Sequence, residues 1–332
     1  MARNHVTLAQ VAKTANVSVG TASKALNGRG QLSASTRHRV REVARELGMD
    51  LDVAAQPLAS GHSFIVGVLT TDSYGRFTMP ILTGAEDTFG VGEIAMLLAE
   101  SRGDPIRERH YLRTLRNRKI DGLIVTGRSS DYRASLAELV DVPTVYALSP
   151  SDDPDDTSVV PDDAGGAYRG TQHLIDSGRR SIAVISGPGH HLASTHRANG
   201  AAKALHEAGL EMAGGRALHG EWSERWGFEA AQRLLSTTEF DGVFCGNDQI
   251  ARGVLDCLRE NGTHVPEAVG VVGVDNWTVM AEAARPAITS VDLNLRTVGR
   301  RAAELLVRMI AGNTGPGGVE FVDCTLITRR SA

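Results

Sequence analysis

The segment TLAQVAKTANVSVGTASKALNG, residues 7–28, decides the fold of the N-terminal part of this chain. Thr7, followed three residues later by Gln10, is the pattern of a capping box, in which each side chain satisfies a backbone N–H group at the start of a helix. Apolar residues then recur at intervals of three and four, the spacing of one buried helix face. These signals predict a short helix over residues 8–15.

Two further helices are predicted by the same kind of signal. Asn16 can adopt the left-handed backbone conformation of a sharp turn, and Ser18 can cap a helix over residues 19–26. Ser33 can cap a third helix, whose apolar residues continue at helical spacing up to a terminating Gly48. Three short helices with a turn of three to four residues between the first two are the ingredients of a helix-turn-helix.

Charge is distributed unequally along the chain. Residues 1–48 carry eight Lys and Arg against two Glu, a net charge of +6, so the remainder carries −10 of the overall −4. A segment that repels itself in this way usually binds a polyanion, although a basic face that is merely solvated is the alternative. The basic module is therefore expected to bind double-stranded DNA.

Length and composition limit the remaining possibilities. A chain of 332 residues suits two or three compact domains. It has neither an apolar run long enough to span a bilayer nor a secretory signal, so we expect a cytoplasmic, nucleoid-associated protein without a membrane partner. Cys245, Cys257 and Cys324 show no CxxC spacing, so we expect buried small side chains and neither a disulfide framework nor a zinc site.

From residue 63 onward, short apolar runs alternate with amphipathic segments, which is typical of parallel strands joined by crossover helices. The predicted strands are residues 64–69, 93–98, 122–127, 144–148, 182–187, 242–247 and 269–275. Helices are predicted between them, for example over residues 80–90, 106–118 and 168–178. The glycine-bearing segments near residues 90 and 187 lack the full GxGxxG spacing of a dinucleotide site, so no cofactor is expected.

Polar side chains follow the predicted strands, where open α/β sheets bind their ligands. The polar residues at these positions are Asp72, Arg128, His190, Arg197, Asn247, Asp248, Asp275 and Asn276. Carboxylate, amide and guanidinium groups hydrogen-bond well to vicinal hydroxyls. Aromatic rings can stack on a sugar, and the candidates are Tyr74, Phe77, Trp222, Trp226 and Trp277. This set predicts a sugar-like effector, although Tyr74 and Phe77 have the alternative of lying in the core.

Other roles compete for some of these residues. Asp248 is expected to cap a helix beginning at Gln249, and Asp162 is expected to serve the turn before a helix at residue 168. An enzyme of this fold would need a nucleophile with a base, or a metal cluster. His190 and His191 lack the spacing of metal ligands, and no serine lies in a nucleophile elbow. We therefore expect no enzyme, no catalytic residue and no metal site.

Residues 7–28 and the following LSASTRHRVREVARELGM closely resemble the DNA-binding segment of the lactose-repressor (LacI/GalR) family of bacterial transcription regulators. DGLIV, PDDAGGA, GNDQIARGVL, VPEAVGVVGVDN, TSVD and LITRRS extend the resemblance over essentially the whole chain. It implies an all-α helix-turn-helix domain and an α/β, periplasmic-binding-protein-like core of two Rossmann-like subdomains. The implied divisions are a helix-turn-helix over 1–48, a hinge over 49–62, a first subdomain over 63–161 and 290–322, and a second over 162–289 and 323–332.

The resemblance also implies roles in DNA binding. The implied base-reading residues are Val19, Gly20 and Lys24, of which Lys24 can donate to the acceptors of guanine. The implied phosphate contacts are Ser18, Thr21, Ser23, Asn27 and Thr36. Leu58 matches a residue that inserts into the minor groove at the centre of the operator. Pro57 lies inside the would-be hinge helix, however, so a structured linker without insertion is the alternative.

In the core, the resemblance places Arg197 and Asp275 where family members commonly clamp the hydroxyls of an effector, and Asn247 in the matching cleft motif. The chain departs from the family where DSYGRFTMP replaces the usual Asn-Pro-Phe-Phe, so that Tyr74, Arg76 and Phe77 reshape one wall. The implied function is a homodimeric repressor, paired near Pro80, whose affinity for a pseudo-palindromic operator is controlled by a sugar. Alternatives are a co-repressed or partner-protein-controlled regulator and a sugar-transport protein, and the helix-turn-helix disfavours the last.

Overall fold

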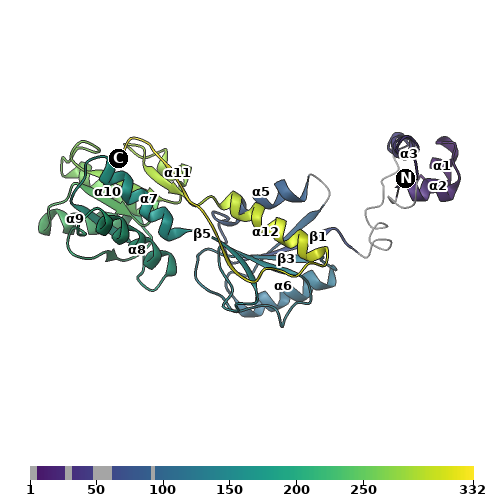
Figure 1. Cartoon of the computed structure of the whole chain (residues 1–332), viewed down its shortest axis with the longest axis horizontal. Coiled ribbons are helices and arrows are strands. Elements are labelled where there is room, and N and C mark those ends of the chain that lie inside the picture. Colours follow the sequence, from purple (N-terminus) through teal and green to yellow (C-terminus); the bar gives the residue numbers. More distant parts are fainter. Residues whose placement is uncertain (1–5, 27–31, 48–61, 91–93) are drawn as a thin grey trace, which may run out of the picture. The chain divides into compact units, whose positions relative to one another are not determined.

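The computed structural model describes residues 6–26, 32–47, 62–90 and 94–332. The chain separates into two compact units, one with the N-terminal helices and one that begins at Val66 and contains the sheets (Figure 1). Residues 118–121 group with the first unit. Asn27 and Leu58, two of the predicted DNA contacts, lie outside the described residues, as does Pro57 of the predicted hinge.

The first unit consists of the helices α1 (Leu8–Thr14), α2 (Val19–Leu26) and α3 (Ala34–Glu46). The predicted capping box is present, because the Thr7 N–H donates to Oε1 of Gln10 at 2.7 Å and the Gln10 N–H donates to Oγ1 of Thr7 at 3.4 Å. Ser18 and Ser33 cap the next two helices, and their hydroxyls accept the N–H group three residues along at 3.0 and 3.2 Å. Local signals therefore determine where each helix begins.

The turn between α1 and α2 is tight because Asn16 adopts the predicted left-handed conformation, with φ 51°. The helices pack small side chains against one another, and the fully buried ones include Val11, Ala22, Ala25, Val40 and Ala44. Side chains of this size allow the short helices to approach closely. The expected helix-turn-helix is confirmed.

The second unit contains two six-stranded sheets, each with helices packed on it (Figure 1). The first sheet has the order β11-β5-β4-β3-β1-β2, and its pairings from β11 through β5, β4 and β3 to β1 are parallel. Its strands are β1 (Ile65–Thr70), β2 (Ala95–Glu100), β3 (Gly122–Thr126), β4 (Thr144–Ala147), β5 (Thr157–Pro161) and β11 (Gly318–Val322). With α5 (Thr78–Phe89), α6 (Pro105–Asn117) and α12 (Leu295–Ile310), this sheet forms what we call the first subdomain.

The second sheet has the order β12-β10-β9-β8-β6-β7. Its neighbours pair in parallel, except that β10 and β12 are antiparallel. Its strands are β6 (Ile182–Ser186), β7 (Leu218–His219), β8 (Gly242–Cys245), β9 (Gly270–Val274), β10 (Thr289–Asp292) and β12 (Thr325–Ile327). The second subdomain adds α7 (Asp163–Asp176), α8 (Leu192–Glu207), α9 (Glu224–Thr237), α10 (Asp248–Glu260) and α11 (Thr278–Ala281).

The chain crosses between the two sheets after β5, after β10 and after β11. The expected boundary at residue 290 falls inside β10, which pairs with β9 in the second sheet, so this crossing instead follows Asp292. Helix α7 also begins earlier than residue 168, because Asp162 caps it by accepting the N–H of Gly165 at 2.8 Å. With these corrections, the predicted α/β core of two Rossmann-like subdomains is confirmed.

Helices α5 and α12 cross at close range in the first subdomain. A Cβ atom on Gly84 would lie 1.9 Å from the carbonyl oxygen of Arg296, and one on Gly299 would lie 1.9 Å from that of Ile81. Two glycines facing the partner backbone allow a separation that side chains would prevent.

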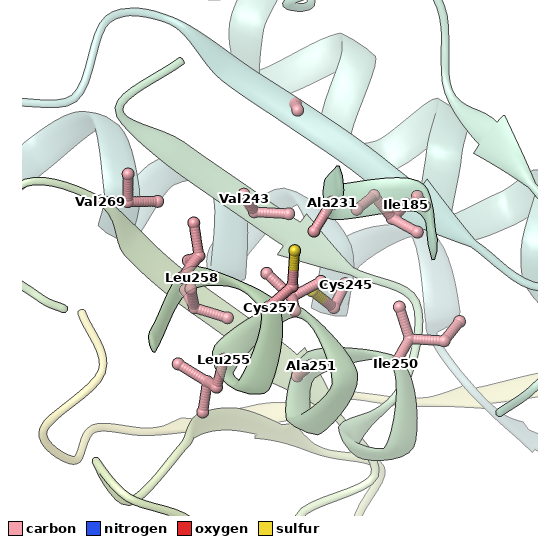
Figure 2. Close-up of a cluster of buried hydrophobic side chains, with 14 of the residues drawn as sticks. Ile185, Ala231, Val243, Cys245, Ile250, Ala251, Leu255, Cys257, Leu258 and Val269 are labelled. Carbon is pink, nitrogen blue, oxygen red and sulfur yellow. The ribbon is translucent and has the colours of Figure 1, made fainter. Parts of the chain in front are cut away.

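The core of the second subdomain packs β8 and β9 against α9 and α10, and Figure 2 shows part of it. Cys245 and Cys257 lie among the aliphatic side chains of this cluster, and Cys324 is buried elsewhere in the same subdomain. Burial raises the pKa of the Cys245 thiol well above its usual range, so it stays protonated. The cysteines are free and buried, as predicted. Among the described residues, no helix has the length and apolar character needed to cross a membrane.

Candidate functional site

Helix α2 has one buried and one exposed face. Ala22, Ala25 and Leu26 are buried in the helical core. Gly20 and Lys24, one helical turn apart, are exposed, and Val19 retains 50% of its accessible surface. The implied base-reading side chains therefore lie on the solvent side of the helix, which is the geometry that insertion into a major groove requires.

Three of the implied phosphate contacts, Ser18, Thr21 and Thr36, lie at helix N-termini. The hydroxyls of Ser18 and Thr21 are 2.8 Å apart at the start of α2, and those of Ser33 and Thr36 are 2.7 Å apart at the start of α3. Ser23 is half-buried on α2. The positive end of a helix dipole together with hydroxyl donors makes such a terminus a favourable place for a phosphate oxygen.

In the second unit, a cavity of about 540 Å³ lies between the subdomains, beyond the carboxyl ends of the strands. Seven of the predicted effector residues line it: Phe77, Arg128, His190, Arg197, Trp222, Asn247 and Asp275. They come from segments that follow β1, β3, β6, β7, β8 and β9. The topology thus gathers side chains that are up to about two hundred positions apart in the sequence.

Asp72 and Tyr74 do not line this cavity, which corrects two of the predictions. Asp72 is buried, and its Oδ2 accepts the N–H groups of Phe77 and Thr78 at 2.8 and 2.9 Å, so it secures the start of α5. Tyr74 retains 97% of its accessible surface, so it is not a core residue either. Of the two aromatic residues proposed for this loop, Phe77 is the one that reaches the cavity.

The cap of α10 is also assigned differently. Asn247 is the N-cap, because its Oδ1 accepts the N–H of Ile250 at 2.8 Å. The prediction that Asp248 caps this helix is wrong. Asp248 instead accepts the N–H of Trp277 at 2.7 Å and the hydroxyl of Ser290 at 2.6 Å. Burial, reinforced by the charge of nearby Asp275, raises the pKa of Asp248 to about 7.

Arg197 is buried at the centre of the cavity wall, with 5% of its surface exposed. Its Nε donates to Asp163 at 2.8 Å and its Nη1 to the carbonyl of Gly246 at 2.6 Å, while Nη1 also lies 3.7 Å from Oδ1 of Asp275. Burial opposes the charged form, but the two carboxylates outweigh it and raise the pKa of Arg197. The guanidinium is therefore charged and rigidly held.

Asp275 lies opposite Arg197 in a backbone conformation with φ 99°. Its second carboxylate oxygen pairs with Arg76, which belongs to the other subdomain. Burial raises the pKa of Asp275, and the charges of Arg76 and Arg197 oppose that rise. Asp163 was not predicted as a site residue, and Arg76 was predicted to reshape one wall but not to pair with Asp275, because these contacts join segments remote in sequence.

Trp222 forms an aromatic wall of the cavity. Its Nε1 donates to Nδ1 of His191 at 3.2 Å, and its ring lies 5.8 Å from the guanidinium carbon of Arg197. A Cβ on Gly187 would lie 2.1 Å from this ring, so that glycine makes room for it. Trp226, another predicted stacking residue, instead donates to the carbonyl of Ser186 at 2.9 Å and packs on the core.

The cavity therefore combines a fixed cation, a carboxylate and an aromatic face. These groups can bind the hydroxyls and the apolar face of a polyol. Of the described His, Cys, Asp and Glu side chains, no three are grouped to hold a metal ion.

Comparison with protein families gives two matches. Residues 7–49 match the description "Bacterial regulatory proteins, lacI family", and residues 171–332 match "Periplasmic binding protein-like domain". Catabolite control protein A of Priestia megaterium is 30% identical over 316 residues, covering 93% of this chain and 94% of that protein. The HTH-type transcriptional regulator CelR of Thermobifida fusca is 34% identical over 325 residues, covering 94% of each.

Solved structures agree with these matches. A CelR–cellobiose complex superposes with a TM-score of 0.69 at 30% identity, covering 99% of this chain and all of that one. The lac repressor dimer bound to its operator and the anti-inducer ONPF superposes with a TM-score of 0.75, covering 99% of each chain. At 23% sequence identity, this second similarity shows a shared fold and no more.

Proposed function

Because this chain belongs to the lacI family of bacterial regulatory proteins, we propose that it is a transcriptional repressor whose hold on its operator is controlled by a small sugar. One observation carries the choice of effector: the Arg197–Asp275 pair and Trp222 face the same cavity. The charges of the lining residues balance, with three arginines against Asp131, Glu221 and Asp275, which favours an uncharged ligand. The cellobiose bound by the CelR relative is of this class.

DNA recognition is assigned to the exposed face of α2. Lys24 supplies a hydrogen-bond donor to base edges, while the hydroxyls at the starts of α2 and α3 bind phosphates. One such helix reads only a few base pairs, so a homodimer on a pseudo-palindromic site is the natural assembly. Exposed Met79 on α5 and exposed Leu97 and Leu98 on β2 support the pairing of subunits through the first subdomain.

The role is one of binding and not of catalysis. The curated relatives of this chain are transcriptional regulators, and Arg76, Arg197 and Asp275 in the cavity are engaged in ion pairs with carboxylates or guanidinium groups of the chain itself. A protein that acts on chromosomal DNA works in the cytoplasm, at the nucleoid. Control by a co-repressor or a partner protein is the second candidate.

The direct experiment is a fluorescence-anisotropy titration of the protein with DNA from upstream of its own gene, repeated with cellobiose and other neutral sugars. An inducing sugar lowers operator affinity, and a co-repressing sugar raises it. Trp222→Ala should abolish the sugar response and keep operator affinity in the absence of sugar, because Trp222 lies in the cavity wall. Tyr74→Ala is the matched control, since this aromatic side chain is outside the cavity and should leave the response unchanged.

Absence of sequence-specific DNA binding would refute the proposal. Specific binding without a response to any sugar would instead favour the partner-protein candidate. A sugar response that survives Trp222→Ala would remove this cavity as the effector site.

A further inference from the structure

Arg76 lies in the loop between β1 and α5, in the first subdomain, but its guanidinium pairs with groups of the second. Its Nη2 contacts Oδ2 of Asp275, which follows β9, and its Nη1 donates to Oε1 of Gln249 at the start of α10, at 3.2 Å. The side chain is 17% exposed and that of Asp275 is 7% exposed. A single arginine therefore makes a largely buried, charge-assisted bridge between the two halves of the core.

Two aromatic rings hold the guanidinium in place. Its central carbon lies 4.3 Å from the ring centroid of Trp277, in the second subdomain, and 5.0 Å from that of Phe77, in the first. Cation–π contacts of this kind favour a desolvated arginine over the less delocalised ammonium of lysine. The stacking thus adds a second contact across the same junction.

The loop that carries Arg76 is itself fixed. Asp72 accepts two N–H groups at the start of α5, as described above, and its carbonyl accepts the N–H of Gly75 at 3.1 Å. Gly75 has φ 70°, a conformation that favours glycine. The hydroxyls of Thr70 and Thr78 close the base of the loop at 2.8 Å. The guanidinium is consequently delivered from a rigid support.

A second junction between the subdomains also lies beside the cavity. Oδ1 of Asp131, in the first subdomain, accepts the N–H of Leu192 at the start of α8, at 2.8 Å. Ser130 donates to Oδ2 of Asp163 at 3.1 Å. These contacts engage one charged group each, whereas the Arg76 junction joins two opposite charges, so it is the stronger of the two.

We propose that Arg76 is a positioning residue of the effector site: it ties Asp275 to the first subdomain and holds the two halves together before any sugar binds. The bridge consists entirely of the chain's own side chains, so it needs no ligand to form. The inference rests on the proposed function in one respect, that the cavity is the effector site. A bound sugar then stabilises an arrangement that Arg76 has already selected.

The test measures the distance between the subdomains by double electron–electron resonance. Spin labels are attached at Ala137→Cys in the first subdomain and Lys203→Cys in the second, two exposed positions, in full-length protein diluted into unlabelled chains. The native cysteines are buried and remain unlabelled. The sugar-free protein should show one dominant short distance. Arg76→Gln should add a longer distance and lower the ratio of the short-distance population to the long-distance population by about tenfold or more. This is the range expected for the loss of a charged hydrogen bond.

Two further variants separate the bridge from general damage. Arg76→Lys keeps the charge and loses the forked geometry and stacking, so it should restore part of the short-distance population. Arg225→Gln removes an arginine whose ion pair with Glu229 stays within α9, and it should leave the distribution unchanged. Adding cellobiose should move Arg76→Gln back toward the short distance and change the wild-type protein little.

An unchanged distribution in Arg76→Gln would overturn the proposal, and so would an equal change in Arg225→Gln. The sugar-free measurements decide this even if no sugar proves to be an effector. Conversely, failure of cellobiose alone to restore the short distance would count against the assigned effector site and would leave the bridge established.

Discussion

The pH dependence of stability should report on the buried carboxyl of Asp248. Its pKa is raised from the ordinary value of 3.8 to about 7, first by burial and then by the charge of Asp275. Between these two values the folded protein holds a proton that the unfolded chain releases. Stability from this group is therefore present at low pH and is lost as the pH rises through 7, opposite to the usual behaviour of a salt-bridged aspartate.

The size of this effect follows from linkage. One pKa unit corresponds to about 1.4 kcal/mol, so raising the pH from 5 to 8 should cost the wild-type protein about 2–3 kcal/mol through Asp248. Asp248→Asn removes the ionisation and keeps the shape. Its amide oxygen can still accept the N–H of Trp277, and the Ser290 hydroxyl can turn to accept from the amide nitrogen.

The assay is thermal or urea unfolding of both proteins at pH 5, 6, 7 and 8, comparing only their difference so that other titrating groups cancel. The stability of the variant relative to the wild-type protein should rise by about 1.4 kcal/mol per pH unit from pH 5 and should level off once the pH has passed 7. A difference that stays constant across this range would show that Asp248 is ionised throughout, and the argument from its burial would fail.

Three other substitutions test the site and the DNA-binding unit. Asp163→Asn should cost about 3–5 kcal/mol of unfolding free energy, because it leaves the buried guanidinium of Arg197 short of a counter-ion. The control Asp323→Asn, at an exposed pair with Arg169, should cost less than about 1 kcal/mol, and equal losses in the two variants would contradict the reasoning. Asn247→Ala should lower the free energy of unfolding by about 1 kcal/mol because it removes the cap of α10, and Asn247→Ser should recover most of that loss. Unchanged stability together with lost sugar binding would make Asn247 a ligand contact instead. Lys24→Ala should weaken operator binding by about 1–3 kcal/mol and relax the preference for one base, as measured in a competition binding assay. An unchanged base preference would show that Lys24 does not read a base.

Local chemistry explains which parts of the fold were predictable. Thr7, Ser18 and Ser33 each act within a few residues of themselves, so the starts of α1, α2 and α3 could be read directly. The strands β5, β7, β10, β11 and β12 were not predicted as strands, and all of them except β7 adjoin crossings between the sheets. Nothing in their immediate neighbours marks the sheet to which they belong.

The site was predictable by position and less so by role. The rule that ligands bind beyond strand ends located Arg197 and Asp275 correctly beside the cavity, and it also selected Asp72, which serves the backbone of α5 instead. Asn247 and Asp248 are adjacent and both suit a helix start, and only the packing around Trp277 distinguishes them. The pairing of Arg76 with Asp275 joins positions 199 apart, which no local pattern encodes.

The placement of the two final strands has a consequence for synthesis in the cell. β11 and β12 are each an outermost strand of their sheet, and both come from residues 318–327. Neither half can complete its sheet until residues 318–327 have been synthesised, so both halves depend on the same late segment. A premature stop anywhere before residue 318 would leave two unfinished sheet edges, and such a product should be removed by proteolysis before it could compete for the operator.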